Sequence, residues 1–559
     1  MLATRTTAAG FLFFALAWLA YDHYPPWMSF HSEALALYGM GLLAVGRCFR
    51  RDTDRFIAPR PVWVIFAAGL LPWVQYLAGI SFFAGDALVV SLYFCALTTA
   101  IWLGYGYALE PDETSYALTG VFFMIWFAAL VSAAIGLVQW LNLNEPFGMY
   151  MAQTDIGDRA MGNLGQPNQL ATLLLMGIAS LAWTFERKRM GHLGLIFGVT
   201  FLTLVLALSR SRAGLISALV VGAFLLWKHW AQPGRLKPGY VVVWLLIYGA
   251  FLLLTPQLQD FLMLGESRSM NVAIDSARPI IWNQVLTGIS QAPWFGYGWN
   301  QTPAAQAAGS IGIPGSWPVT YAHNIVLDIL AWNGLPLGFL LTGLCGWWFL
   351  SRFWQVSQPA AVYAMAALIP VLVHSMAEFP FAYAYFLLAA GMMVGIVEAF
   401  HRGVKTIAFD IRWMSASLAV WFILGSYMAY EYLQIEKDFV VVRFENLRVG
   451  QTPADYAAPD ILLLSHMGTM LNVFRQKAVP HMSLGELEEL RRTSLRFPYG
   501  ALSLRYALAL GLNGSPAEAT RQFATMRGLY GPVYYQAAVD VLRELQRDKY
   551  PELALVLTP

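Results

Sequence analysis

Two arginines in a short polar break are the first residues of this chain with a clear capacity for chemistry. Arg210 and Arg212 stand in Ser209-Arg210-Ser211-Arg212, between two apolar stretches. An arginine near membrane depth costs about 2.5–3.5 kcal/mol, so two of them together need a partner. Snorkelling to the membrane interface is one explanation. We favour an anion site, because a planar guanidinium can hold phosphate oxygens through two parallel hydrogen bonds.

A histidine lies near the end of residues 256–332, the longest connection on its side of the membrane before the C-terminal tail. The sequence predicts no clear helix or strand here, and such a stretch is uncommon unless it binds or catalyses. It carries Arg278, the segment Pro293-Trp294-Phe295-Gly296-Tyr297-Gly298-Trp299 and finally His323-Asn324. A lone histidine of this kind is more often an interfacial residue. Beside the arginines, His323 is a candidate general base, because an unperturbed imidazole titrates near ~6.5.

Two further polar elements supply uncharged and acidic groups. Residues 162–169 contain Gln166 and Asn168, which suit sugar hydroxyls or phosphate oxygens, and residues 374–380 contain Glu378. The acidic residues of the same connections show neither a DxD pair nor His-x-x-x-His spacing; they are Asp155, Asp158, Glu266, Asp275 and Glu378. We therefore predict that arginines neutralise the phosphate, with no metal ion and no other cofactor.

The composition indicates which scaffold holds these side chains. Of 559 residues, 58% are hydrophobic and 12% are charged, which is about half the charge of a soluble domain. Apolar runs of about 18 residues or more recur, and each can cross ~30 Å of hydrocarbon. This excludes a soluble enzyme, a disordered chain and a fibrous repeat, and the net charge of +2 does not suggest a nucleic-acid partner. The predicted fold class is an all-α polytopic membrane protein set in a lipid bilayer.

The apolar runs predict about 13 transmembrane helices. They lie near residues 8–22, 31–47, 61–80, 87–108, 115–140, 167–185, 191–208, 213–228, 239–255, 333–351, 358–376, 383–400 and 412–431. Basic residues fall in every second connection, such as 187–189 and 402–412, and these connections are expected on the cytoplasmic side. The candidate residues named above fall in the opposite set, together with Arg159 and Arg268.

The last part of the chain is predicted to form a separate domain. Residues 1–431 make the transmembrane domain, with the connection 256–332 outside the cytoplasm, and residues 432–559 make a helical domain on that same side. Short amphipathic helices are expected at 484–495, 500–512, 515–529 and 531–546. The segment 510–519 is typical of a tetratricopeptide-like pair, although one or two units give a weak repeat signal. The domain is either a helical cap or a docking surface for a protein partner.

Arginines, a histidine and amides on one membrane face point to a lipid-linked phosphate. If the leaving group is a pyrophosphate on a polyprenyl chain, its developing charge must be neutralised by cationic side chains or by a metal. The attacking hydroxyl is a poor nucleophile near neutral pH, so a histidine base is useful. The residues alone therefore predict a transferase or a transporter of an anionic lipid at the outer leaflet.

Five segments, in order along the chain, resemble one known family. They are Gly165-Gln166-Pro167-Asn168, Ser209-Arg210-Ser211-Arg212-Ala213-Gly214, Ile281-Trp282 through Gly296-Tyr297-Gly298, His323-Asn324-Ile325-Val326-Leu327-Asp328 and Glu378-Phe379-Pro380-Phe381-Ala382-Tyr383-Ala384-Tyr385-Phe386. The family is the bacterial O-antigen ligase and polymerase superfamily, and the chain resembles most its protein O-oligosaccharyltransferases of the PglL type. Each motif is weak alone, whereas the ordered set is specific.

The resemblance implies a multi-pass enzyme of the bacterial inner membrane whose active site faces the periplasm. Such an enzyme transfers a glycan en bloc from undecaprenyl pyrophosphate to a Ser or Thr hydroxyl of a periplasmic or pilin-like protein, on a GT-C-like helical fold without a required metal. The family's pyrophosphate-binding arginines match Arg210, Arg212 and Arg278. Its long-loop histidine matches His323, which Asn324 follows as a substrate-binding amide.

The remaining substrate-binding residues carry over from the same motifs. The amide motif matches Gln166 and Asn168, and Glu378 opens the last segment. The family's late tyrosine matches Tyr383 or Tyr385. If both lie on one helix, only one can face the site, because residues two apart point about 200° apart.

Three alternative functions stay open. An O-antigen ligase transfers the glycan to lipid A core, and a polymerase lengthens the lipid-linked glycan, with the same donor and the same membrane face. The Gln-Pro-Asn and Glu-Phe-Pro segments and the extra C-terminal domain favour a protein acceptor. A lipid-linked glycan transporter is less consistent with the sequence, because such folds show inverted repeats and midplane sites.

Overall fold

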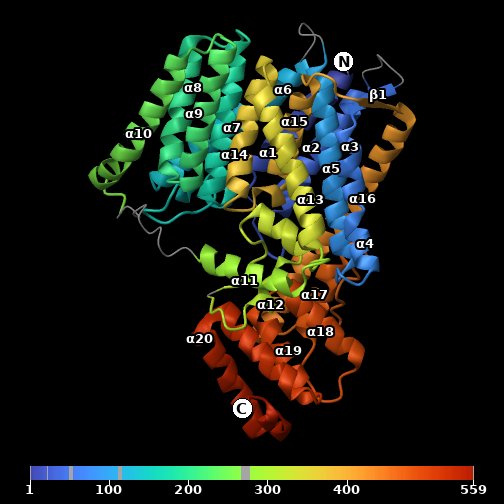
Figure 1. Cartoon of the computed structure of the whole chain (residues 1–559). Coiled ribbons are helices and arrows are strands. Elements are labelled where there is room, and N and C mark those ends of the chain that lie inside the picture. The colour runs from blue at the N-terminus through green and yellow to red at the C-terminus, as the bar shows by residue number, and fades with distance from the viewer. Residues whose placement is uncertain are drawn as a thin grey trace. The chain divides into compact units, whose positions relative to one another are not determined.

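The computed structural model describes residues 2–21, 23–49, 55–110, 116–265, 277–315 and 317–557, and these are mostly helical (Figure 1). The chain divides into two compact units. The first unit contains Met1–Ala68, Tyr93–Ile274 and Trp347–Ser426. The second unit contains Gly69–Leu92, Asp275–Gly346 and Tyr427–Pro559. Helices α5 (Ala84–Ala108), α13 (Ile325–Gln355) and α16 (Ile411–Leu447) contribute residues to both units.

The first unit is a helical bundle with one small sheet. Its helices are α1 (Leu2–Leu19), α2 (Phe30–Cys48), α3 (Pro61–Ala68), α6 (Tyr116–Trp140), α7 (Pro167–Glu186), α8 (His192–Leu208), α9 (Arg212–Ala231), α10 (Pro238–Phe261), α14 (Pro359–Ser375) and α15 (Ala384–Ala399), with 3-10 turns η1 (Glu145–Tyr150), η2 (Gly162–Leu164) and η4 (Pro380–Ala382). Strands β1 (Arg55–Pro59) and β2 (Thr406–Asp410) pair antiparallel, with Arg55 opposite Asp410.

Seven helices within the described ranges are long and apolar enough to cross a membrane: α1, α5, α6, α7, α9, α10 and α13. This confirms the expectation of a polytopic membrane protein. Other predicted spans coincide with shorter apolar helices, at Pro61–Leu77, His192–Leu208, Pro359–Ser375 and Ala384–Ala399. The total of thirteen spans therefore stays a prediction.

Helix α7 lies at the centre of the first unit. In its apolar window 94% of the residues are buried, against 22% in α10, because α7 packs against α6, α8, α9 and α14. Pro167 begins the helix, where its missing N–H costs nothing. Phe122 of α6 stacks on Trp183 of α7 at 4.2 Å between ring centroids. A central position for α7 means that the polar residues at its start are held by the packed core.

The expectation that residues 256–332 lack helices is wrong. Helix α10 continues through Pro256, and α11 (Arg278–Gln291) and α12 (Thr302–Gly309) follow before α13 begins at Ile325. A proline at the start of both α11 and α12 favours helix initiation. These helices escaped the sequence reading because they are short and polar on their buried side, at Gln284 and Gln306. Glu266, Arg268 and Asp275 lie outside the described residues.

The second unit includes the helices of the C-terminal part. They are α17 (Ser465–Arg475), α18 (Leu484–Arg496), α19 (Gly500–Leu512), α20 (Pro516–Asp548) and η5 (Pro551–Leu555), and α4 (Leu71–Leu77) belongs to the same unit. The last two predicted helices form one α20, which bends at Gly531, where φ is +81°. The predicted boundary at residue 431 stays a prediction, since the second unit also contains residues 69–92 and 275–346.

A buried ion pair ties α18 to the start of α5 within the second unit. The Arg496 guanidinium lies 2.7 Å from the Asp86 carboxylate, and both side chains are buried. His466 of α17 lies beside this pair and is only 2% exposed. Burial, reinforced by the positive charge of Arg496 and opposed by the carboxylate of Asp86, lowers the pKa of His466 from 6.5 to about 4.

Acid is therefore expected to destabilise the second unit through His466. The unfolded chain binds a proton below about pH 6.5, whereas folded His466 stays neutral down to about 4, so stability is lost as the pH falls through this window. Between pH 7.5 and 5.0 the loss is about 2 kcal/mol. Thermal melting at these two pH values should show a smaller drop for His466→Gln than for the wild type. The exposed His481→Gln is the matched control, and an unchanged drop in His466→Gln contradicts the prediction.

Candidate functional site

In the first unit, the predicted arginines occupy a tight turn between α8 and α9. Arg210 has a left-handed backbone (φ +45°) and donates from Nη2 to Oε1 of Gln259, near the end of α10, at 2.7 Å. Partial burial lowers the pKa of its guanidinium, and the carboxylate of Asp260 opposes this shift. Arg212 is exposed at the first position of α9. Ala160 donates to the carbonyl of Leu208 at 3.4 Å, which brings the segment that carries Arg159 to the same turn.

Ser211 connects this turn to the amide motif. Its hydroxyl accepts from the backbone N–H of Gly214 at 2.9 Å, which caps α9, and donates to Oδ1 of Asn168 at 2.7 Å. The amide nitrogen of Asn168 in turn faces Oε1 of the buried Glu378 at 3.5 Å. Gln166 is the N-cap residue of α7, half-buried and with an extended backbone. The structure therefore links the arginine turn, the amide motif and Glu378 through one chain of polar contacts.

The two late tyrosines lie on the same side, contrary to the expectation for one helix. Tyr383 is the N-cap residue of α15 and has an extended backbone, so the separation of about 200° between residues two apart on a helix does not apply to this pair. Its ring stacks on that of Tyr385 at 5.4 Å between centroids. Tyr385 is 1% exposed and donates to Oε1 of Gln169 at 3.1 Å, whereas Tyr383 is half-buried and also bonds to Gln169. Tyr383 is therefore the more exposed of the two tyrosines.

A buried carboxylate of α2, Glu33, was missed by the sequence reading. It is 2% exposed and accepts hydrogen bonds from Ser29 and Trp27, and its helix α2 packs against α15, the helix of Tyr385. The available signal was a single acidic residue in an apolar run, since ionisable groups inside membrane spans are usually functional. Glu33 therefore joins the tyrosine side of the candidate site.

In the second unit, His323 forms the turn before α13. Its backbone is left-handed (φ +56°), and its side chain is half-buried. The preceding peptide is held on both sides: the Ala322 N–H donates to Oδ1 of Asp328 at 2.9 Å, and the Ala322 carbonyl accepts from Nε1 of Trp282 at 2.9 Å. Asn324 caps α13, because its Oδ1 accepts from the N–H of residues 326 and 327 at 3.0 and 3.2 Å. Part of the side chain that was predicted to bind substrate is therefore used for capping.

Asp328 anchors the turn of His323 to α12. It is fully buried, and its Oδ1 also accepts from the hydroxyl of Thr302 at 2.6 Å. That hydroxyl accepts in turn from Nε1 of Trp332 at 2.8 Å. The glycine-aromatic segment packs against the same part of α13, since the N–H of Tyr297 donates to the carbonyl of Ala331 at 2.8 Å. The segment is thus part of the support for His323.

Arg278 lies on α11, the helix whose Trp282 holds the turn of His323. It is half-buried at the first position of the helix, and Trp282, one turn later, holds the peptide before His323. Residues four apart lie on one face of a helix. The second unit therefore gathers Arg278, His323 and Asn324, and the first unit gathers the other predicted residues. That the two groups form one site stays a prediction.

Loss of the Asp328 carboxylate is expected to loosen this turn. In Asp328→Ala, the Thr302 hydroxyl and the Ala322 N–H lose their acceptor, at a cost of about 1–3 kcal/mol for each unpaired buried group. Asp328→Asn keeps an acceptor oxygen in the same place. Thermal melting of the purified protein should therefore show a clear decrease in Tm for the alanine variant and a smaller one for asparagine. Equal Tm values for the two variants are the outcome that excludes an anchoring role for Asp328.

Three family models match successive parts of the chain. The model described as a protein glycosylation ligase matches residues 160–185, which include the amide motif. The model described as an O-antigen ligase matches residues 197–342, which include the three arginines and His323. The model described as the C-terminal part of a virulence factor membrane-bound polymerase matches residues 362–544.

Two proteins of Acinetobacter baylyi are similar to this chain. A general O-oligosaccharyltransferase is 27% identical over 538 residues, which cover 93% of this chain and 91% of the relative. A ComP-specific O-oligosaccharyltransferase is 25% identical over 375 residues, which cover 66% of each chain. The resemblance drawn from the ordered motifs is thus confirmed: the chain is a glycosyltransferase-type enzyme that is similar to O-antigen ligases and to PglL-type protein O-oligosaccharyltransferases.

Proposed function

We propose that this enzyme transfers a glycan en bloc from undecaprenyl pyrophosphate to a Ser or Thr hydroxyl of a periplasmic or pilin-like protein. Both relatives are named O-oligosaccharyltransferases, and the name of one gives ComP as its specific acceptor. The observation that carries the proposal is the arginine turn between two apolar helices, joined through Ser211 and Asn168 to Glu378. It offers cations for a phosphate and amide groups for a sugar.

Charge neutralisation at the leaving group is the first part of the proposed mechanism. The acceptor oxygen attacks the anomeric carbon of the glycan while the bond from that carbon to the pyrophosphate oxygen breaks. The lipid pyrophosphate leaves with the bonding electron pair. Arg210, Arg212 and Arg278 bind the departing oxygens, and donors fixed in advance stabilise this charge more effectively than water does.

Proton transfer at the acceptor is the second part. A ring nitrogen of His323 accepts the hydroxyl proton as the new C–O bond forms. The clamped peptide of Ala322 and the capped start of α13 keep the imidazole in place, so little ordering is required in the transition state. Gln166, Asn168 and Tyr383 bind the sugar or the pyrophosphate.

We place this site on the periplasmic side of the inner membrane. The distribution of Lys and Arg supports this orientation, because the connections near 187–189 and 402–412 are basic and the arginine turn lies at the other ends of the helices. By the same alternation of basic connections, residues 432–559 fall on the periplasmic side, where a protein acceptor can reach them.

Transfer to a lipid acceptor is the second candidate function. It is favoured by the matching models for an O-antigen ligase and for a membrane-bound polymerase. The reaction at the donor is the same in all three cases, and only the acceptor differs.

Intact-mass analysis of the acceptor tests the proposal. Purified enzyme is incubated with a polyprenyl-pyrophosphate oligosaccharide and a pilin or another periplasmic protein. A mass gain of one whole glycan on the protein, lost in His323→Ala, is the expected result. A longer lipid-linked glycan with unmodified protein indicates a polymerase, and glycan on lipid A core indicates a ligase. No product from competent substrates contradicts all of the transferase functions.

A further inference from the structure

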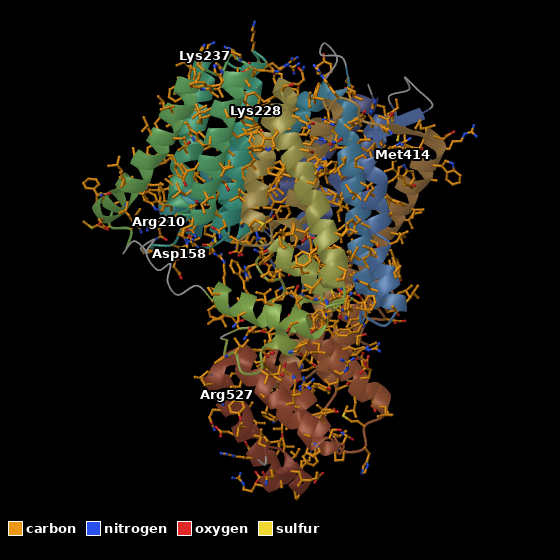
Figure 2. All side chains as sticks on the ribbon, in the orientation of Figure 1. Asp158, Arg210, Lys228, Lys237, Met414 and Arg527 are labelled. Carbon is orange, nitrogen blue, oxygen red and sulfur yellow. The ribbon has the colours of Figure 1, made fainter. Side chains whose placement is uncertain are left out.

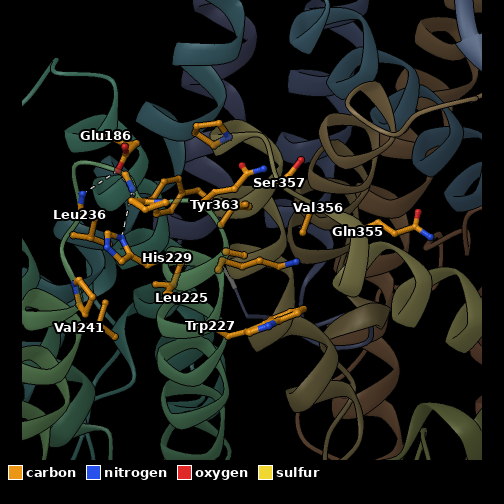
Figure 3. Close-up of a pocket in the computed structure, with 18 of the residues that line it drawn as sticks. Glu186, Leu225, Trp227, His229, Leu236, Val241, Gln355, Val356, Ser357 and Tyr363 are labelled. Atoms are coloured by element: carbon orange, nitrogen blue, oxygen red, sulfur yellow. Dashed lines mark hydrogen bonds between the residues drawn. The ribbon is translucent and has the colours of Figure 1, made fainter.

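A pocket opens in the first unit, at the opposite end of the bundle from the arginine turn. Its volume is about 290 Å³. It lies between the last turns of α7 and α9, the first turns of α10 and α14, and residues 354–357 at the end of α13 (Figure 3). Lys228 lies at one end of these helices and Arg210 at the other (Figure 2). Helix α7, with 20 residues, separates the two ends by about 30 Å.

Lys228 is the charged group of this pocket. It is 7% exposed, and its Nζ donates to the carbonyl of Trp354 at 3.0 Å and lies 3.9 Å from the ring centroid of Trp227. Among the described residues, no carboxylate lies within 4.0 Å of this ammonium. A buried charge is costly unless it is paired. A carbonyl dipole and an indole face stabilise the ammonium in part, and the pocket is where a counter-anion can complete the pairing.

Two helix N-termini add positive potential to the same pocket. Pro238 begins α10 and Pro359 begins α14, and both residues line it. The first turns of a helix carry unsatisfied N–H groups and a partial positive charge, which favour anions. His229 contributes a donor, because its Nδ1 accepts from the N–H of Gly234 at 3.4 Å and leaves Nε2 to carry the proton.

Glu186, the acidic residue of the pocket, is occupied by other donors. Its carboxylate accepts from the backbone N–H groups of Arg235 and Leu236 at 2.7 and 3.0 Å and from the hydroxyl of Tyr363 at 3.1 Å. It therefore fixes the connection before α10 to α7 and α14. It does not serve as the counter-ion of Lys228.

The surroundings of the pocket indicate a lipid as the source of the anion. Trp354 lines the pocket and is 65% exposed, and Trp230, in the last turn of α9, is 82% exposed. Tryptophan is enriched at the depth of the lipid headgroups. Basic pockets between transmembrane helices on the cytoplasmic side bind anionic headgroups. We propose that this pocket binds the phosphate of an anionic glycerophospholipid, with Lys228 as its charged ligand.

Native mass spectrometry of the full-length protein tests this lipid site. The protein is released from detergent after equilibration with phosphatidylglycerol, with diacylglycerol of the same chains, or with inorganic phosphate. The wild type should retain one phosphatidylglycerol per chain and no diacylglycerol. Lys228→Gln should bind phosphatidylglycerol about tenfold more weakly, as expected for the loss of one charge-assisted hydrogen bond. Lys237→Gln, an exposed lysine next to the pocket, is the matched control and should bind like the wild type.

Three outcomes overturn the proposal. Equal weakening by Lys228→Gln and Lys237→Gln means a general attraction to the basic surface. Equal retention of diacylglycerol means that the phosphate is not recognised. Retention of inorganic phosphate that displaces the lipid at equal concentration means a site for a soluble anion. If Lys228→Gln elutes as aggregate in size-exclusion chromatography, the comparison of the three ligands on the wild type still shows whether the pocket selects a phospholipid.

Discussion

Replacement of His323 by alanine is expected to lower kcat for glycan transfer by about 10²–10⁴-fold, the usual contribution of a general base. The protein should still be produced, because Ala322, Asn324 and Asp328 make hydrogen bonds that fix this turn, and its Tm should fall only by the small cost of alanine at a left-handed position. Since the step that is lost occurs in the transition state, kcat and kcat/KM should decrease together. The measurement is the initial rate of protein glycosylation at saturating lipid-linked donor.

The chain offers an unusually close control for this substitution. His481 also belongs to the second unit, is exposed, and has a left-handed backbone with φ +64°, against +56° for His323. His481→Ala therefore repeats the change of side chain and the backbone strain without touching the site. A second variant, His323→Asn, keeps a residue that tolerates this conformation but lacks the base. Near-normal rates for both His323 variants exclude a base at this position and leave the reaction to leaving-group neutralisation.

Replacement of Arg210 by glutamine is expected to lower kcat by about 10²–10³-fold, as when one donor to a developing oxyanion is removed. Glutamine keeps a hydrogen-bond donor near Gln259 but loses the positive charge. Arg210→Lys keeps the charge and loses the planar fork, so its rate should fall between those of the wild type and the glutamine variant. Single-turnover kinetics, with the enzyme in excess over the lipid-linked donor, separate this effect from slow release of the product.

The control for Arg210 removes the same charge elsewhere in the first unit. Arg402 is exposed, in the connection before β2, and Arg402→Gln should transfer glycan at the wild-type rate. If Arg210→Gln matches Arg402→Gln, the arginine turn is an interfacial anchor, and the snorkelling explanation is correct. If Arg210→Lys transfers glycan as slowly as Arg210→Gln, the bidentate geometry of the guanidinium matters more for the rate than its charge.

Apolar periodicity in the sequence was sufficient to predict the long helices and several of the residues at which they begin or end. A run without charged residues over residues 115–140 can satisfy its backbone in lipid only as a helix, and α6 spans Tyr116–Trp140. The run predicted at 213–228 corresponds to α9, which begins at Arg212 because the Ser211 side chain caps it. In the C-terminal part, four amphipathic runs predicted α18, α19 and the two halves of α20, because each run places its apolar residues on one face.

Contacts between distant residues were decided only by the tertiary structure. Whether Tyr383 and Tyr385 share a face depends on where α15 begins, and helix ends are poorly determined by local pattern. The support of His323 joins Trp282, Thr302 and Asp328, which no local spacing relates. The same holds for the lipid pocket, where Lys228 meets the carbonyl of Trp354 across 126 residues of chain. Residue type and spacing indicated the chemistry. Packing decided which groups meet, because hydrogen bonds between distant segments form only once the helices are assembled.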